Sequence, residues 1–297
     1  MRAAVVPAIH GKWEVKDVPT PHPATNQVLI KIHASGLCYY DVHITEGHLP
    51  TSARTIGHEP AGEIVELGSG VASRKIGDRV GVPWLQASCR RCEWCQRGKP
   101  MFCLQQIGTG INTPGSHAEY MVAYADATTL IPNGISYEQA APVFCAGYTV
   151  WSGLRFADPK PHEKIAVLGI GGLGHLAIQF SKAAGFYTIG ITHSQDKEEL
   201  ARKLGDDIVV SNGDALKRAG GADVILVTSN SYKPAKLQVL PVDLEILPMI
   251  LKFGSRLNSD LAHIIHPDML LHLDKLKVVS FSYFLINNGL SCLSILM

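Results

Sequence analysis

The sequence lacks the marks of several protein classes. Its 27 Lys and Arg balance 26 Asp and Glu to a net charge of +1, and no basic cluster is present. This excludes the electrostatic footprint of a nucleic-acid-binding protein. Residues 1–6 lack the continuous apolar stretch of a signal peptide. We therefore expect a cytoplasmic protein whose partners are neither nucleic acid nor a membrane.

Cysteine is also scarce, and six of the seven cysteines fall into two groups. The first group is Cys89, Cys92, Cys95 and Cys103, with two, two and seven residues between successive members. Four thiolates this close can form a tetrahedral shell around one zinc ion. A ferredoxin-type iron–sulfur run has three residues before its fourth cysteine and a proline after it, whereas Leu104 follows here. Disulfides are disfavoured because no secretory leader is present, so the spacing predicts a structural zinc site.

The second group is spread along the chain as Cys38, His58 with Glu59 beside it, and Cys145. Two cysteines and one histidine leave the fourth position of a zinc ion free. Each residue alone also has a plainer interpretation. His58 could be a hydrogen-bonded core histidine, and Cys145 could simply pack within the apolar run 140–146.

A glycine turn follows the apolar run 165–168 and weighs against those plainer interpretations. It comprises Gly169, Gly171, Gly172, Leu173 and Gly174 and leads into a helical pattern that ends at Gly185; a second strand is expected at 187–192. Glycines at this spacing allow a tight turn and let the backbone approach a pyrophosphate, which then lies at a helix N-terminus. The turn therefore predicts a dinucleotide-binding fold.

An open zinc site together with a nicotinamide site indicates hydride transfer at a carbon bearing oxygen. Four features occur in one order: the segment 38–43, Gly57-His58-Glu59, the four-cysteine lobe and the glycine turn. On these residues the chain resembles the zinc-containing medium-chain alcohol dehydrogenases from Met1 to about Ala235. Segment 84–89 is most similar to the yeast-like and bacterial tetrameric branch.

The resemblance implies an α/β plus β fold class. A GroES-like β domain that holds both zinc sites is expected at residues 1–157, and a Rossmann NAD(P)-binding domain with a divergent C-terminus at 158–297, with a proline-rich link at 158–161. Strands are expected at 27–33, 61–67, 78–82, 117–123, 128–132 and 222–228. A helix from Ser136 towards Leu154 should carry Cys145.

The resemblance also implies the chemistry of the site. Cys38, His58 and Cys145 would hold the catalytic zinc, with Glu59 as a neighbour or alternate ligand. Asp41 would orient the ligating histidine, and His43 would form the outer end of a proton relay. The expected cofactors are two zinc ions per chain and NAD or NADP. The expected substrate is a small primary alcohol or aldehyde, and the expected assembly is a homo-oligomer of two or four chains.

Three positions concern the substrate pocket. Tyr40 stands where the family has a serine or threonine that takes the substrate's proton, so Tyr40 either works as a displaced relay or turns away and water substitutes. Trp84 matches the residue that narrows the pocket around small primary alcohols, although an ordinary core aromatic would look the same. Leu49 replaces a tryptophan, which would admit somewhat longer chains.

Cofactor choice depends on the end of the second nucleotide-domain strand. NAD-specific sites place a carboxylate there, about twenty residues after the glycine turn, to hold the ribose 2′-hydroxyl. Thr192 takes that place here, and it does not reject NADP. Lys197 matches a ribose contact that could equally meet a phosphate. Thr149 matches a nicotinamide contact, although a buried helix threonine would look the same.

After about residue 235 the chain departs from the family and looks shortened. The final run 278–297 is uncharged and long enough to cross a bilayer, but its two asparagines, one glycine and four serines argue against this. The departure leaves two alternatives to an alcohol dehydrogenase. One is an inactive zinc- and nucleotide-binding remnant, and the other is a related zinc reductase acting on aromatic or branched aldehydes.

Overall fold

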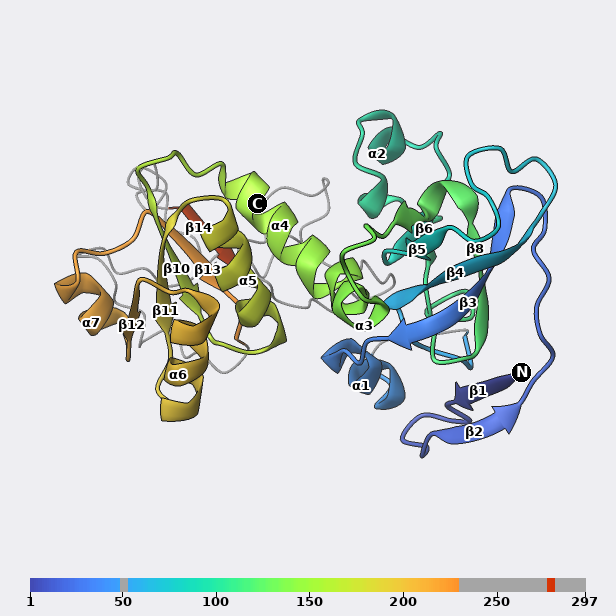
Figure 1. Cartoon of the computed structure of the whole chain (residues 1–297), viewed down its shortest axis with the longest axis horizontal. Helices are drawn as coiled ribbons and strands as arrows, with labels where there is room; N and C mark the ends of the chain where they lie inside the picture. Colours follow the sequence, from blue (N-terminus) through green and yellow to red (C-terminus); the bar gives the residue numbers. More distant parts are fainter. Residues whose placement is uncertain (49–52, 230–276, 281–297) are drawn as a thin grey trace, which may run out of the picture. The chain divides into compact units, whose positions relative to one another are not determined.

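A computed structural model describes residues 1–48, 53–229 and 277–280 of the chain (Figure 1). Its described residues form two compact units that meet in sequence between Tyr148 and Thr149. The expected domain limits of 1–157 and 158–297 remain a prediction. No helix among the described residues combines the length and apolar character needed to span a bilayer. Leu49 lies outside the described residues, as does nearly all of the divergent tail.

The first unit is built on an antiparallel sheet, drawn in blue to green in Figure 1. Its strands lie in the order β8 (Tyr120–Tyr124), β3 (Gln27–Ser35), β4 (Pro60–Leu67), β5 (Arg79–Gly81) and β9 (Thr129–Leu130). Alternate residues of β3 and β8, among them Val28, Ile30 and Met121, point into one buried cluster with Ile64 and Val80. This alternation is what a sheet with one covered face requires.

Shorter elements surround this sheet and carry the site. They are β1 (Arg2–Val5), β2 (Glu14–Asp17), α1 (Tyr39–Thr45), β6 (Leu85–Ala87), α2 (Glu93–Gln96), η1 (Pro100–Phe102), β7 (Ile107–Gly108), η2 (Ala125–Ala127), α3 (Tyr137–Ala140) and η3 (Ala141–Phe144). Strands β1 and β2 pair antiparallel, as do β6 and β7.

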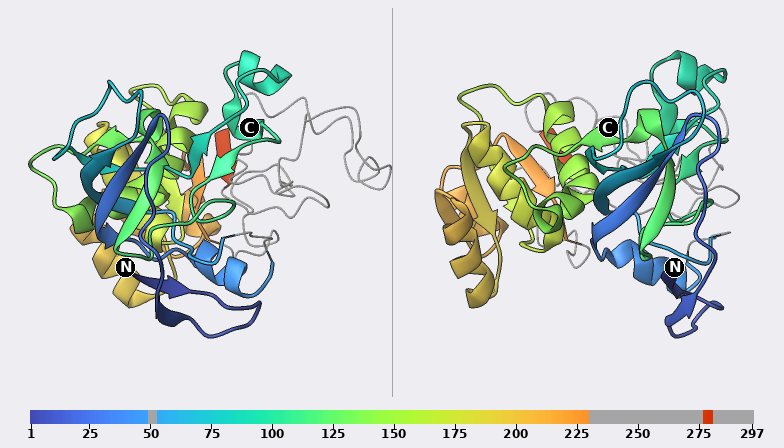
Figure 2. Two further views of the ribbon diagram at one scale, coloured as in Figure 1. Left: turned by 90° about the vertical axis from the view of Figure 1, so that its right-hand side faces the viewer. Right: turned by 45° about the vertical axis from the view of Figure 1, so that its right-hand side comes forward.

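The second unit contains a parallel sheet in the order β12 (Ile208–Val210), β11 (Tyr187–Ile191), β10 (Lys164–Leu168), β13 (Val224–Val227) and β14 (Lys277–Ser280). Its helices are α4 (Ala146–Ala157), which begins in the first unit, α5 (Gly172–Ala183), α6 (Gln195–Leu204) and α7 (Gly213–Arg218). The strand order places β10, which precedes the glycine turn, at the centre. Figure 2 shows the sheet from two further directions.

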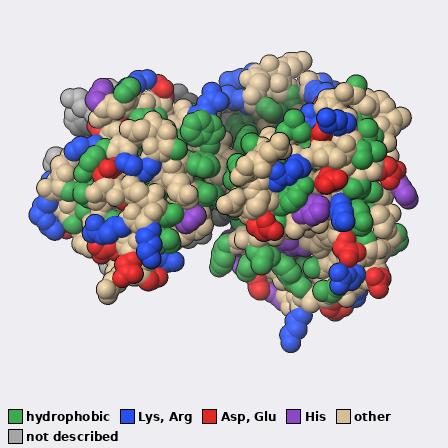
Figure 3. Space-filling model, in the orientation of Figure 1, with side chains coloured by type: hydrophobic (Ala, Val, Ile, Leu, Met, Phe, Trp, Pro, Cys, Tyr) green, Lys and Arg blue, Asp and Glu red, His purple; other side chains and the backbone are tan. Residues whose placement is uncertain are grey.

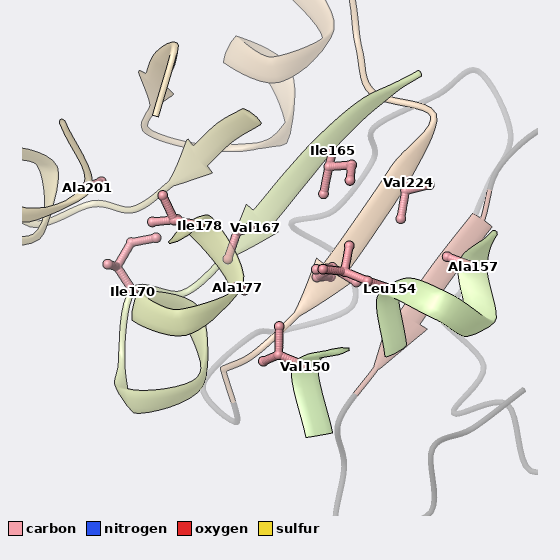
Figure 4. Close-up of a cluster of buried hydrophobic side chains, with 11 residues drawn as sticks. Val150, Leu154, Ala157, Ile165, Val167, Ile170, Ala177, Ile178, Ala201 and Val224 are labelled. Atoms are coloured by element: carbon pink, nitrogen blue, oxygen red, sulfur yellow. The ribbon is translucent and has the colours of Figure 1, made fainter. Parts of the chain in front are cut away.

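Apolar side chains cover both faces of this sheet, as parallel strands require. On one face, Ile165 and Val167 of β10 contact residues of α4 and α5, including Val150, Leu154 and Ile178 (Figure 4). The other face buries a second cluster: Ala166, Ile189, Ile191, Leu216, Ile225 and Val227. On the face of the molecule in Figure 3, Lys and Arg are interspersed with Asp and Glu.

The glycine turn, the helix after it and the stop at Gly185 are confirmed, and Gly185 has φ +88°. The continuous helix expected from Ser136 through Cys145 is wrong. The chain forms α3, then the 3-10 helix η3, and restarts as α4 after Cys145, whose φ and ψ are −122° and −77°. Pro142, which has no N–H to donate, lies within η3 and favours such a break.

The strand expected at 117–123 is present, but its start is wrong, because β8 spans Tyr120–Tyr124. Residues 115–117 instead donate backbone hydrogen bonds to the carbonyls of residues 55–57. These bonds fix the segment before β8 against the segment that leads into His58.

Candidate functional site

A buried cluster gathers Cys38, His58, Glu59 and Cys145, four residues from three parts of the first unit. Their potential ligand atoms all lie within 4.8 Å of one another. The two sulfur atoms of Cys38 and Cys145 are 4.0 Å apart. Zinc–sulfur bonds of about 2.3 Å in a tetrahedron place two sulfurs about 3.8 Å apart. The cluster therefore has the spacing that a zinc ion needs.

Local structure places each member of the cluster. Cys38 is the N-cap of α1, and its backbone N–H donates to Oδ2 of Asp41 at 2.9 Å. His58 and Glu59 immediately precede β4. Cys145 lies at the break between η3 and α4, where the non-helical backbone turns the chain.

The electrostatics of the cluster suit a cation. The hydrogen bond with Cys145 is the main cause that lowers the pKa of Cys38 to about 4; His58 acts in the same direction and burial opposes both. Burial raises the pKa of Glu59 to about 7. A Cβ at Gly36 would lie 1.9 Å from Oε2 of Glu59, so the glycine provides the space that this carboxyl group occupies.

The orientation of the His58 ring suits a metal ligand. Both ring nitrogens are buried and make no hydrogen bond of normal geometry among the described residues; Nδ1 lies 3.4 Å from Oδ1 of Asp41, which leaves Nε2 for a metal ion. Metal-bound histidines typically give their other N–H to a carboxylate in this way. Burial alone would raise the pKa of Asp41, but hydrogen bonds from His117 and His58 hold it well below its usual range. The residues present therefore fit a zinc ion.

The four-cysteine lobe forms a second possible metal site, built from one stretch of chain. Cys89, Cys92, Cys95 and Cys103 offer sulfurs that all lie within 4.8 Å of one another. The sulfur of Cys95 lies 3.9 Å from that of Cys89 and 3.6 Å from that of Cys92. Backbone N–H groups of Arg91 and Cys92 are the leading causes that lower the pKa of Cys89 to about 6. All four donors are thiols, and together they complete a closed tetrahedral set.

Two aromatic residues border the buried cluster. The Tyr40 ring is 2% exposed and stands edge-on to Trp84 and His58, with centroid distances of 4.5 and 5.5 Å. Trp84 also lies 5.3 Å from the His58 ring. The structure thus brings two of the three predicted pocket residues, Tyr40 and Trp84, to the cluster.

His43 lies on α1, with its Nδ1 3.2 Å from Nδ1 of His48. Sequence reasoning missed His48, because no spacing rule connects it to the site. It also missed His117, which lies 3.4 Å from Asp41. The sequence pattern predicts a strand residue at His117 and gives no sign of this contact.

The glycine turn borders a pocket of about 470 Å³ in the second unit. Its lining is Leu168, Gly169, Ile170, Gly171, Ile191, Thr192, His193, Lys197, Thr228 and Ser229. A Cβ at Gly171 or Gly172 would meet nothing within 4 Å, whereas one at Gly174 would lie 1.9 Å from the carbonyl oxygen of Gly169. The first two glycines leave open space for a phosphate, and the third permits close packing of α5. This geometry fits a dinucleotide.

Some predicted cofactor residues lie at the pocket and others do not line it. Thr192 and Lys197 line it. The Leu173 side chain packs against the hydrophobic cluster of β10, α4 and α5. Thr149 is buried in α4, with 2% of its surface exposed.

Comparison with known proteins identifies both units. A family model described as "Alcohol dehydrogenase GroES-like domain" matches residues 24–133, and one described as "Zinc-binding dehydrogenase" matches residues 172–240. An alcohol dehydrogenase of Geobacillus stearothermophilus is 40% identical over 240 residues, which cover 78% of this chain and 71% of that protein.

Two solved structures are similar as well. A cobalt- and zinc-bound thermostable alcohol dehydrogenase from Pyrobaculum aerophilum has a TM-score of 0.71 and 30% identity, covering 78% of this chain and 71% of that one. A structure described as CAD from Helicobacter pylori, complexed with NADP(H), has a TM-score of 0.71 and 26% identity, covering 78% and 70%. The chain therefore belongs to the zinc-binding alcohol dehydrogenases, NAD(P)-dependent oxidoreductases that act on alcohols and aldehydes.

Proposed function

We propose that this chain interconverts a small primary alcohol and its aldehyde, with Cys38, His58 and Cys145 as ligands of the catalytic zinc. The observation that carries the proposal is the composition of the buried cluster. Two sulfurs and one imidazole converge within 4.8 Å, which leaves one zinc position for substrate. Glu59 lies within the same cluster and serves as a neighbouring or alternate ligand. The four-cysteine lobe holds a second, structural zinc.

The residues around the proposed zinc ligands orient them, shape the substrate pocket and transfer the proton. When bound by Cys38, His58 and Cys145, zinc would supply a Lewis acid that lowers the pKa of an alcohol hydroxyl, and NAD(P) would supply the hydride acceptor or donor. Asp41 orients His58 through the 3.4 Å contact with Nδ1. Trp84 and Tyr40 limit the width of the substrate pocket. His43, half-buried beside the exposed His48, exchanges the released proton with solvent.

The nucleotide pocket accepts NADP as well as NAD in this proposal. Thr192 and His193 line the pocket where NAD-specific sites have a carboxylate, and no acidic side chain lines the described pocket. Lys197 lines the same pocket and can face a 2′-phosphate. Thr149 and the turn residues from Gly169 to Gly174 contribute the remaining cofactor contacts.

The proposal extends to organisation in the cell. We place the GroES-like catalytic domain at 1–157 and the Rossmann domain at 158–297. The protein acts in the cytoplasm as a homo-oligomer of two or four chains. These statements rest on the family resemblance and on the composition of the chain.

A steady-state assay tests the proposed function. Zinc-replete protein is measured with ethanol, hexanol and cinnamaldehyde, each with the matching oxidised or reduced form of NAD and of NADP. Turnover of ethanol and hexanol with both cofactors is the expected result. Turnover confined to cinnamaldehyde would assign the chain to the aromatic aldehyde reductases. Zinc and cofactor binding with no turnover of any substrate would identify an inactive remnant.

A further inference from the structure

One carboxylate of the first unit lies between two histidines. Asp41 is 1% exposed; its Oδ1 lies 3.4 Å from Nδ1 of His58, and its Oδ2 lies 3.4 Å from Nε2 of His117. The same Oδ2 accepts the backbone N–H of Cys38 at 2.9 Å. The Asp41 carboxylate therefore links His58 and the Cys38 backbone to a second imidazole, that of His117.

Two serines continue this chain of contacts away from the metal site. Oγ of Ser35 lies 2.8 Å from Nδ1 of His117, and Oγ of Ser116 lies 2.7 Å from Oγ of Ser35. A hydroxyl that donates to Nδ1 leaves the ring proton on Nε2, which faces Asp41. With the proton on Nε2, His117 can donate to the carboxylate, in the same way that a metal-bound histidine takes its tautomer from the bond that its other nitrogen makes.

The backbone holds the His117 ring in place. The N–H of His117 donates to the carbonyl of Ile56 at 3.0 Å, and the N–H of Ser116 donates to that of Gly57 at 3.0 Å. Gly57 has φ +101°, and a Cβ there would lie 2.7 Å from Nδ1 of His117. The Trp13 ring covers His117 at a centroid distance of 5.3 Å. His117 is thus fixed directly against the chain that carries His58.

We propose that His117 is a positioning residue for the catalytic metal: it holds Asp41 so that Asp41 aims Nε2 of His58 at the ion. The inference rests on the proposed ligand set. Partners of this kind commonly contribute 10- to 100-fold to metal affinity. Without His117, the buried carboxylate loses one of the two imidazoles that face it, and the His58 ring loses a fixed orientation.

Competition with a chelator tests this directly on the whole chain. His117→Phe keeps a ring under Trp13 but removes the donor, and we expect the affinity of the catalytic zinc to fall about 10- to 100-fold. His117→Gln keeps an N–H donor and should restore affinity to within about threefold of wild type. Ser35→Ala, which removes the hydroxyl at Nδ1, should lose less than His117→Phe. His33→Phe is the matched control, because it makes the same substitution at a histidine that stacks on Tyr137 instead, with ring centroids 4.5 Å apart.

Two further readouts separate positioning from folding. The Co²⁺-substituted protein should show an altered thiolate-to-cobalt absorption band in His117→Phe, while melting of the metal-free variant should match that of His33→Phe. Unchanged zinc affinity and an unchanged cobalt band in His117→Phe would overturn the inference, as would a His117→Gln variant as weak as His117→Phe. Failure of the proposed ligand set is distinguishable, because Cys38→Ser would then still bind two zinc ions. Failure of turnover alone would leave these metal-binding readouts unchanged.

Discussion

The two units of this protein differ in the groups that form their sites. The first unit uses side-chain donors, with thiols and an imidazole gathered from positions as distant as Cys38 and Cys145. The second unit uses mainly backbone, where Gly171 and Gly172 leave space beside the N-terminus of α5. Replacing one ligand atom should therefore weaken metal binding in the first unit. Adding a Cβ at a glycine should weaken cofactor binding in the second unit.

The first unit contains the same contrast on a smaller scale. Its four-cysteine lobe is local and chemically uniform, so one short stretch of chain contains every donor. Its buried cluster is mixed and non-local, and it depends on neighbours such as Asp41 and Gly36. The lobe should therefore serve stability, and the buried cluster should serve turnover.

The largest expected effect separates these two metal sites. Cys38→Ser should reduce zinc from two ions per chain to one and lower turnover by about 10³-fold or more, because several kcal/mol of charge stabilisation are lost. Cys92→Ser should also lose one zinc, but with a large drop in melting temperature, because a structural zinc contributes directly to folding. Elemental analysis and thermal melting provide the readouts. One zinc or none in wild-type protein would contradict the two-site assignment.

The backbone site is tested by adding one methyl group at two glycines. Gly171→Ala should fold normally, since its Cβ meets nothing within 4 Å, yet bind NAD(P) about 10- to 100-fold more weakly because the methyl group occupies the phosphate space. Gly174→Ala should instead cost about 1–3 kcal/mol of folding stability, because its Cβ would overlap the Gly169 carbonyl. Titration calorimetry and denaturant unfolding measure the two effects. Equal cofactor affinity in Gly171→Ala and wild type would contradict the pocket assignment.

The substrate side of the first unit depends on the bulk of Tyr40. Tyr40→Thr should raise the kcat/KM of hexanol relative to ethanol about tenfold, because it opens space beside Trp84 and His58. Tyr40→Phe is the control, since it keeps the ring and should keep the wild-type ratio and rate. A loss of 10²- to 10⁴-fold in the Phe variant would instead assign proton transfer to the hydroxyl.

Cofactor selectivity tests the role of the Thr192 side chain, which lines the nucleotide pocket of the second unit. Thr192→Asp should shift the ratio of kcat/KM values towards NAD by about tenfold, since a carboxylate binds the ribose 2′-hydroxyl and repels a 2′-phosphate. Ser211→Asp adds the same charge to the same unit at an exposed residue outside the pocket lining and should leave the ratio unchanged. If both variants leave the ratio unchanged, Thr192 does not discriminate between the cofactors.

The smallest effect concerns a carboxyl group in the second unit that contrasts with Asp41. Both oxygens of Asp206 are buried without a hydrogen-bond partner among the described residues, and Gly190 provides their space. Burial, with Asp207 adding to it, raises the pKa of Asp206 to about 7. The folded state therefore binds more protons than the unfolded state between about pH 4 and 7, and the contribution of Asp206 to stability falls as pH rises through that window.

Asp206→Asn should remove that fall and raise the melting temperature by about 2–4 °C at pH 8. Asp207→Asn is the opposite control, because Asp207 accepts hydrogen bonds from Nζ of Lys182 and from the N–H of Thr188. Its loss should lower the melting temperature at the same pH. A melting temperature of Asp206→Asn below that of wild type across pH 4–8 would contradict this account.

Features that depend on neighbouring residues could be predicted from the sequence alone. The four-cysteine spacing, the glycine turn with α5 after it, and the strands β3, β4 and β10 follow from donor type, glycine conformation and apolar periodicity, all of which operate over a few residues. The trio of Cys38, His58 and Cys145 could be predicted because the glycine turn, and then the family resemblance, outweighed the plainer interpretations. Spacing alone left each of these residues with a plainer interpretation.

Tertiary structure alone decided the rest, because contacts between distant segments depend on packing that no local pattern contains. It ended α3 at Ala140 and placed Cys145 at the break between η3 and α4. It drew residues 115–117 along 55–57 instead of extending β8, and so brought His117 to Asp41. The sequence by itself determined which atoms can bind zinc and where a dinucleotide turn lies; only the fold determined which neighbours orient those atoms.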